Sequence, residues 1–140
     1  MEMMNNPNNL RIRIMPMPKD TNANGNIFGG WIMSQIDIAG AIAARDLNPG
    51  KTVTIAVNSL EFRESVKVGD ILSLYAKVTK VGNTSIQTTI EVSAERMIDF
   101  KKICLHVTSA IVTYVAVDEE GKKRVFEKDK TLLKELGLLD

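Results

Sequence analysis

The chain has 140 residues, of which 44% are hydrophobic and 25% are charged, and its formal net charge at pH 7 is +1. This length suits one domain with its own core, and the balanced charge gives no reason to expect nucleic acid or an anionic membrane as a partner. The single cysteine, Cys104, excludes an intrachain disulfide. The first ten residues lack a continuous apolar segment, so we expect no signal peptide, and no apolar run is long enough to span a membrane. The expectation is a cytoplasmic protein.

The first third of the chain predicts a tail, a strand, a loop and a helix. Residues 1–10, rich in Asn and Met, are expected to form a flexible tail. Residues 11–17, RIRIMPM, alternate charged and apolar side chains as a strand does, and two prolines place the end of that strand at a sheet edge or loop. Residues 20–30 contain the Asn and Gly typical of a loop. From 31 to about 46, apolar residues recur at spacings of three and four, which predicts a helix that is apolar on nearly all sides.

Only strand signals follow this helix, up to a short C-terminal tail. Four long segments rich in Val, Ile and Thr are separated by turn-like stretches: residues 52–62, 71–81, 84–96 and 102–118. Short connections between long strands predict antiparallel neighbours. The tail, residues 126–140, is charged and has leucines spaced as in a short amphipathic helix.

These elements predict one α+β domain over residues 11–125, in which an antiparallel sheet wraps around one long central helix. A single sheet cannot surround a helix that is apolar on all sides. The apolar area left uncovered therefore predicts a dimer.

The residue inventory excludes several kinds of site. There is one histidine, His106, so any Ser-His-Asp or Cys-His mechanism must use it. It shares a strand face with Cys104, and the simpler interpretation is a pair of strand residues on a partly covered face. One Cys and one His cannot supply a zinc site, and the acidic residues lack the loop spacing of a calcium site, so we expect no metal. The segment NANGNIFGG lacks the Gly-Lys-Ser/Thr ending of a phosphate loop.

Two features of residues 20–44 point to chemistry. Asp37 lies within the apolar run of the predicted helix, where a carboxylate is costly unless it is hydrogen-bonded or lies in a cavity. Gly29 and Gly30 leave backbone N–H groups and the positive end of the helix dipole available to a developing oxyanion, although a turn with tight packing would also explain them. The two features are about 10 Å apart by helical rise, too far to act on one atom within a subunit. A dimer resolves this if one subunit's helix start faces the other subunit's carboxylate.

The stretch DTNANGNIFGGWIMSQIDIAGAIAA, residues 20–44, resembles the signature of hot-dog-fold acyl-CoA thioester hydrolases of the short bacterial YciA type. The similarity continues in family order through VTIAVNSLEF, VKVGDIL, GNTSIQTTIEV and YVAVDEEGK, and so covers roughly residues 11–124. One departure is Ser65, at a position often occupied by proline. The resemblance implies a hot-dog fold, hydrolysis of acyl-CoA to free CoA and a carboxylic acid, and a trimer of dimers. It implies no cofactor beyond the CoA moiety of the substrate.

The resemblance also implies roles for individual residues. Asp37 of one subunit would act with Asn22 of the partner subunit, Asp37 as general base or nucleophile and Asn22 as the group that orients the water or the thioester. The backbone N–H of Gly30 would polarise the thioester carbonyl, and Gly29 would shape the approach. A polar turn and neighbouring basic residues would hold the CoA moiety, and the candidates are Thr84, Ser85, Arg63, Arg96, Lys101 and Lys102.

Two alternatives use the same fold differently. A hydratase or dehydratase normally pairs a histidine with an acid, and the only histidine here lies outside the helix motif. A non-catalytic acyl-CoA-binding or sensing module would not need Asp37; a DNA-binding regulator is not indicated, because no basic helix-turn-helix pattern precedes residue 11. The acyl chain length depends on how Met33, Ile36 and Phe62 pack, which the sequence does not tell.

Overall fold

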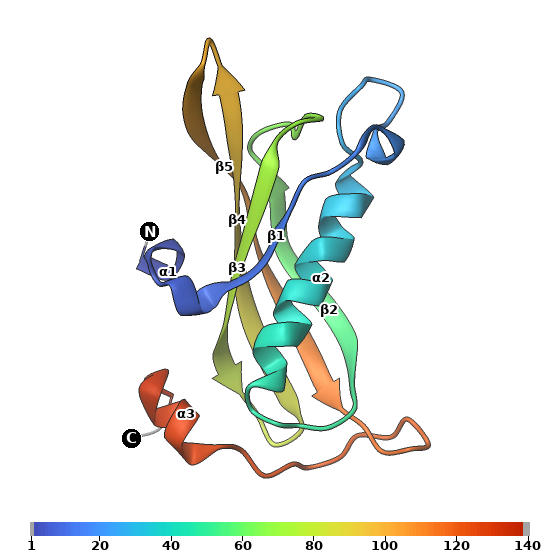
Figure 1. The fold of residues 1–140 in the computed structure, drawn as a ribbon. Coiled ribbons are helices and arrows are strands. Elements are labelled where there is room, and N and C mark those ends of the chain that lie inside the picture. The colour runs from blue at the N-terminus through green and yellow to red at the C-terminus, as the bar shows by residue number, and fades with distance from the viewer. Residues whose placement is uncertain (1, 139–140) are drawn as a thin grey trace.

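The computed structural model describes residues 2–138, and its elements follow the predicted order of one strand, one long helix and four strands (Figure 1). In chain order they are α1 (Glu2–Asn5), the 3-10 turn η1 (Pro7–Asn9), β1 (Leu10–Ile14), the 3-10 turn η2 (Pro18–Asp20), α2 (Gly29–Arg45), β2 (Thr52–Phe62), β3 (Ile71–Val81), β4 (Ser85–Ile98), β5 (Lys101–Ala116) and α3 (Lys130–Glu135). None of the helices within residues 2–138 combines the length and apolar character needed to cross a membrane.

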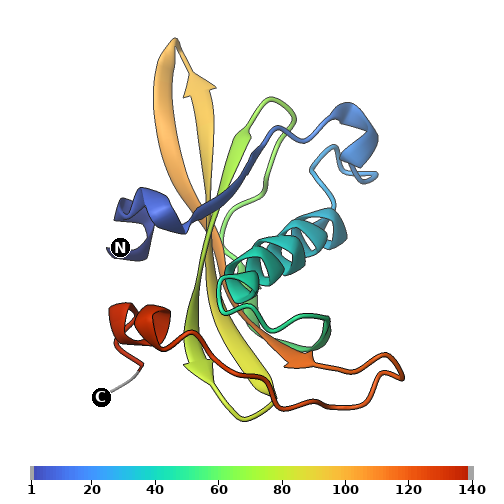
Figure 2. The same ribbon diagram turned by 60° about the horizontal axis from the view of Figure 1, so that its bottom comes forward.

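The five strands form one antiparallel sheet in the order β1-β3-β4-β5-β2. Helix α2 lies across one face of this sheet, chiefly on β3 and β4, and the strands curve past it (Figures 1 and 2). Alternate residues of β4 are buried beneath the helix, as the two-residue period of a half-buried strand requires. The predicted α+β architecture is confirmed.

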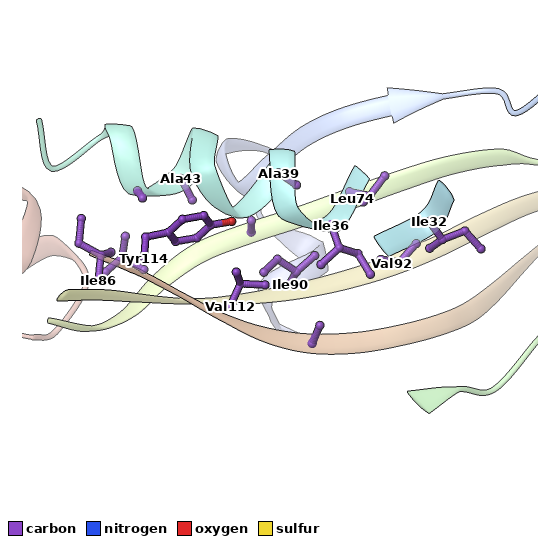
Figure 3. Packing of buried hydrophobic residues seen from close by; sticks show 14 of the residues in the cluster. Ile32, Ile36, Ala39, Ala43, Leu74, Ile86, Ile90, Val92, Val112 and Tyr114 are labelled. Carbon is purple, nitrogen blue, oxygen red and sulfur yellow. The ribbon is translucent and has the colours of Figure 1, made fainter. Parts of the chain in front are cut away.

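The core between helix and sheet is apolar and tightly packed (Figure 3). Ile32, Ile36, Ala39 and Ala43 project from α2 toward the sheet, as helical spacings of three and four predict. The opposite side of α2 is less covered, and Met33 and Ile38 are exposed. The sheet of one subunit therefore covers only part of the apolar helix.

One buried tyrosine sets how α2 sits on the sheet. Tyr114 of β5 points at the helix (Figure 3), and its hydroxyl donates to the backbone oxygen of Asp37 at 2.5 Å. Gly40 makes this approach possible, because a Cβ at that position would collide with the Tyr114 hydroxyl and with Thr88 Oγ1. Burial raises the pKa of Tyr114, and the negative charge of Asp37 raises it further, so the phenol stays a donor.

The ends of the chain and one hairpin differ in detail from the expectation. Where a flexible tail was predicted, α1 and η1 pack on the sheet, with Met3 and Asn9 buried. Helix α3 lies where a C-terminal helix was predicted and buries Leu133; Leu139, part of the predicted leucine pattern, lies outside the described residues.

The hairpin that joins β4 to β5 is longer than predicted. Its turn consists of only two residues, Asp99 and Phe100, with φ of 50° and 65°. Two successive positive φ values match the twist of a hairpin, but this turn lacks the Asn-Gly or Asp-Gly signature from which such turns are recognised in sequence.

Candidate active site

The loop before α2 is folded around the side chain of Asn22. Asn22 Oδ1 accepts hydrogen bonds from the backbone N–H groups of Asn24 at 2.9 Å and Asn26 at 3.2 Å. The backbone N–H of Asn22 donates to the Asn26 carbonyl at 2.7 Å. Gly25 completes the turn with φ of 81°, a value that few other residues adopt. Because the loop itself uses Oδ1, the amide Nδ2 is the group that Asn22 offers to a ligand. Asn22 is therefore a hydrogen-bond donor here.

The start of α2 leaves backbone donors outside the helical ladder. The first bond of the ladder runs from the Ile32 N–H to the Phe28 carbonyl at 3.2 Å, so the N–H groups of Gly29 and Gly30 lie beyond it. Phe28 makes no side-chain cap. A Cβ at Gly30 would meet none of the described residues within 4 Å, and one at Gly29 would lie 3.5 Å from the Phe62 ring. Packing within the subunit therefore does not require glycine at either position.

A hollow of about 260 Å³ opens between this loop, the start of α2 and the end of β2. Its lining residues are Asn22, Asn26, Ile27, Gly29, Ile32, Phe62, Arg63, Glu64, Ser65 and Val66. Three predicted site residues thus meet here: Asn22, Gly29 and Arg63. Asp37 lies outside the hollow, further along α2.

Asp37 is half-buried, and its partner comes from β2. The Thr54 hydroxyl donates to Asp37 Oδ1 at 2.8 Å, which leaves Oδ2 for other interactions. Sequence reasoning missed Thr54, because threonine is common in strands and nothing in the chain near residue 54 refers to the helix. What links the two is the register of β2, which sets Thr54 beside Tyr114, the residue bonded to the backbone of Asp37.

Asp37 and Asn22 are associated with opposite ends of β2. Thr54 is near the first residue of that strand, whereas Phe62, which borders the Asn22 hollow, is the last. Along α2, Asp37 lies eight residues beyond Gly29, which borders the hollow, and this spacing corresponds to about 12 Å by helical rise. Within one subunit, the hollow lined by Asn22 and the carboxylate of Asp37 are therefore separate.

The strand between these two ends is an open sheet edge with apolar side chains. Strand β2 pairs with β5 on one side and is last in the sheet order. Val53, Ile55 and Val57 are 42%, 56% and 38% exposed. An open edge strand with exposed apolar residues favours pairing with a strand of another chain.

The remaining candidates for CoA binding are dispersed. Thr84 and Ser85 lie in the β3–β4 turn, where their carbonyls accept from Ala116 and Gly82, and this turn is at the end of the sheet opposite the Asn22 loop (Figure 1). Lys101 and Lys102 are exposed at the tip of the β4–β5 hairpin. The structure does not bring these four residues to the hollow.

The two arginines proposed from the sequence as phosphate ligands, Arg63 and Arg96, are hydrogen-bonded to other residues of the same subunit. Arg63 Nη1 donates to Ser109 Oγ at 3.3 Å and lines the hollow. Arg96 donates to both oxygens of Asp70, at 2.9 and 2.8 Å, and to the Ser65 carbonyl at 2.9 Å. The guanidinium expected to hold a CoA phosphate is thus occupied within the subunit.

His106 is paired with an acid, but away from α2. Its Nε2 lies 2.7 Å from Glu91 Oε2 and 3.3 Å from Ser109 Oγ. Glu91 alternates with the buried residues Ile90 and Val92, so the cluster lies on the face of the sheet away from the helix. One ring nitrogen faces both partners, which is not the acid–His–Ser order of a catalytic relay. The cluster therefore does not contribute to the site around Asp37.

Comparison with known proteins identifies the family. Residues 24–100 match the family model described as Thioesterase superfamily. The chain belongs to this superfamily. It is 44% identical over 121 residues to the acyl-CoA thioester hydrolase YciA of Escherichia coli K12, covering 82% of this chain and 88% of that protein. The expected resemblance to YciA-type thioester hydrolases is confirmed.

Solved structures confirm the fold. A Campylobacter jejuni protein described as a hexameric hotdog fold thioesterase superposes with a TM-score of 0.83 at 50% identity, covering 92% of this chain and 96% of that one. An acyl-CoA hydrolase of Staphylococcus aureus superposes with a TM-score of 0.71 at 28% identity, covering 84% and 71%. Two structures of the latter carry single substitutions of an aspartate and of a threonine 17 positions later, the residue types and spacing of Asp37 and Thr54. The predicted hot-dog fold is thus confirmed.

Proposed function

We propose that this protein hydrolyses acyl-CoA to free CoA and a carboxylic acid, and that each active site combines Asp37 of one subunit with Asn22 of the partner subunit. The observation that carries the proposal is the hydrogen bond of Asp37 to Thr54 on the open edge strand β2. This carboxylate is held by one oxygen, lies at a surface that invites a second chain, and belongs to a thioesterase-family fold.

Antiparallel pairing of β2 with its copy would assemble the site. If the two-fold axis passes near Asn58, Thr54 of one subunit lies beside Phe62 of the partner subunit. Since Phe62 and Asn22 border the same hollow, Asn22 of the partner subunit then approaches Asp37. The same pairing covers the exposed apolar residues of the edge. We propose further that three such dimers form a hexamer, as the C. jejuni relative is described.

The chemistry follows from the atoms that remain available. Oδ2 of Asp37 either takes a proton from the attacking water or attacks the thioester carbonyl itself, giving a mixed anhydride that water then cleaves. In both routes the carbonyl oxygen becomes an oxyanion. Asn22 Nδ2 and the Gly30 N–H are donors suited to it, and the helix dipole of α2 adds to the stabilisation. Collapse of the tetrahedral intermediate breaks the C–S bond, and CoA leaves as a thiolate that is then protonated.

The reaction needs no cofactor, because water is the only co-reactant. For the CoA moiety we propose Arg63 as a phosphate partner, since it lines the hollow beside Asn22. The acyl chain would run along the apolar surface that α2 leaves exposed at Met33 and Ile38.

Release of free thiol from acyl-CoA substrates of increasing chain length tests the function. We expect turnover by the wild type, and a loss of at least about a hundred-fold in kcat for Asp37→Asn, because this change removes the reacting carboxylate. Asn22→Ala should also lower kcat, because it removes the proposed oxyanion donor together with the Oδ1 acceptor that shapes the loop. Binding of acyl-CoA without thiol release would instead identify a sensing module, and full activity of Asp37→Asn would refute the assigned mechanism.

A further inference from the structure

The connection between β2 and β3 is held by one ion pair whose carboxylate is buried. Arg96 from β4 donates through Nε and Nη2 to the two oxygens of Asp70, at 2.9 and 2.8 Å. The Asp70 side chain is 2% exposed, and its Oδ2 also accepts the Lys67 N–H at 2.9 Å. Nη2 of Arg96 donates in addition to the Ser65 carbonyl at 2.9 Å. Both oxygens of the buried carboxylate are thus used, and the connection over residues 65–70 is held at three points.

This connection in turn carries the loop that contains Asn22. Val66, between Ser65 and Lys67, is buried in the core, and its carbonyl accepts the N–H of Ile27 at 2.9 Å. Ile27 is itself buried, and the residue before it, Asn26, closes the loop onto the Asn22 N–H at 2.7 Å. Hydrogen bonds joined by single peptide units therefore link Arg96 to Asn22.

We infer that Arg96 and Asp70 are positioning residues for Asn22: their ion pair fixes the residue 65–70 connection, and this connection fixes the Asn22 loop. The inference rests on the proposed function for its effect on turnover. A planar guanidinium that binds a carboxylate with two parallel bonds restricts both groups to one geometry, which a single-point contact does not. Catalytic hydrogen bonds need such restriction, because a displacement of about 1 Å can cost on the order of a hundred-fold in rate.

The same region contains a second arginine–carboxylate ion pair that holds no loop and can therefore serve as a control. Arg13 of β1 donates through Nη2 to both oxygens of Glu95, the neighbour of Arg96, at 3.2 and 3.1 Å. These side chains are 52% and 24% exposed, and they join β1 to β4 across the intervening strand β3. An exposed ion pair of this kind contributes little to the stability of the fold, and its loss should not displace a loop.

Arg96→Lys and Arg13→Lys test the inference with the charge retained. Lysine has no rigid fork and cannot hold both Asp70 oxygens and the Ser65 carbonyl together, whereas it would still bind a phosphate. We expect Arg96→Lys to lower kcat by roughly ten- to a hundred-fold, with the same factor on acyl-CoA and on acyl-pantetheine, which lacks the nucleotide. Arg13→Lys should leave kcat unchanged on both substrates. A loss confined to the KM for acyl-CoA would make Arg96 a CoA ligand and overturn the inference.

Amide hydrogen exchange tests the geometry without relying on activity. In Arg96→Lys we expect the N–H groups of Asn22 and Ile27 to exchange on the order of ten-fold faster, with the Ile90 amide in the centre of β4 unchanged. Asp70→Asn, which keeps the shape of the side chain, should do the same. Unchanged loop exchange in both variants, or an equal rise at Ile90, overturns the inference. If the wild type releases no thiol, the proposed function fails while the exchange result still decides the positioning role.

Discussion

The two ends of strand β2 carry the two halves of the proposed active site, and they are built differently. At the Thr54 end, Asp37 is a side chain on a helix that the buried Tyr114 anchors to the sheet. At the Phe62 end, Asn22 belongs to a loop that is folded around its own side-chain oxygen, which accepts two backbone N–H groups of that loop. In the proposed site, the first end supplies the acid and the second supplies the oxyanion donors. Neither end would be complete alone, so on this proposal the open edge between them is a part of the site.

Mixing two inactive variants would test most severely whether the ends belong to different subunits. Asp37→Asn and Asn22→Ala are each expected to lose most activity. In a mixed dimer, one site would combine an intact Asp37 with an intact Asn22, so co-assembled variants should recover about a quarter of the wild-type sites if subunits pair at random. Thiol release before and after co-refolding measures this.

The control is each variant refolded alone, which should recover nothing. If Asp37 and Asn22 acted within one subunit, every site in the mixture would keep one defect. Absence of recovery, with mixed dimers shown to be present, would therefore place the two residues in one subunit.

Loss of the Thr54 hydroxyl is expected to lower kcat less than loss of Asp37. Thr54→Ala removes the hydrogen bond that orients the Asp37 carboxylate, and one bond to a charged group corresponds to a loss of about ten-fold in kcat. Thr54→Ser keeps the hydroxyl and should retain most activity. Equal losses in the two variants would mean that the methyl group, not the bond to Asp37, matters.

A substitution in the middle of β2 is expected to have the smallest effect, and the effect is on dimer dissociation. Asn58→Asp hardly changes the size of the side chain, but near a two-fold axis the new charge meets its own copy, and repulsion of about 1 kcal/mol at close range would raise the dimer dissociation constant roughly five-fold. Asn8→Asp, next to the β1 edge, is the matched control and should not change it. Sedimentation at low and high salt measures both, and the difference should shrink as salt screens the charges. An unchanged constant for Asn58→Asp would place the dimer axis elsewhere.

Much of the fold could be predicted because its signals are local. The spacing of apolar residues identified α2 within about two residues, and runs of β-branched residues identified β2 and β3 with the bounds that the structure has. A break between β4 and β5 was predicted over residues 97–101, but not its position at Asp99 and Phe100, because these residues are not those that usually adopt two positive φ values.

The candidate site was predictable only in part. Asn22, Gly29 and Gly30 share one loop and helix start, so a sequence motif reveals them together. Thr54 and the partner of Arg96 do not belong to that motif, because each contact joins residues far apart in the chain. A basic residue in the sequence is equally suited to a phosphate and to a carboxylate, and only the position of Asp70 decides which of them Arg96 meets.

The sequence by itself determined the order of elements, the acid within an apolar helix and the family, since periodicity and motif spacing are properties of the chain alone. Tertiary structure decided which end of β2 each site residue occupies, that Thr54 holds Asp37, and that Arg96 is tied to Asp70. These depend on strand register and sheet order, which follow from the packing of the whole sheet against α2 and are not encoded in any short segment.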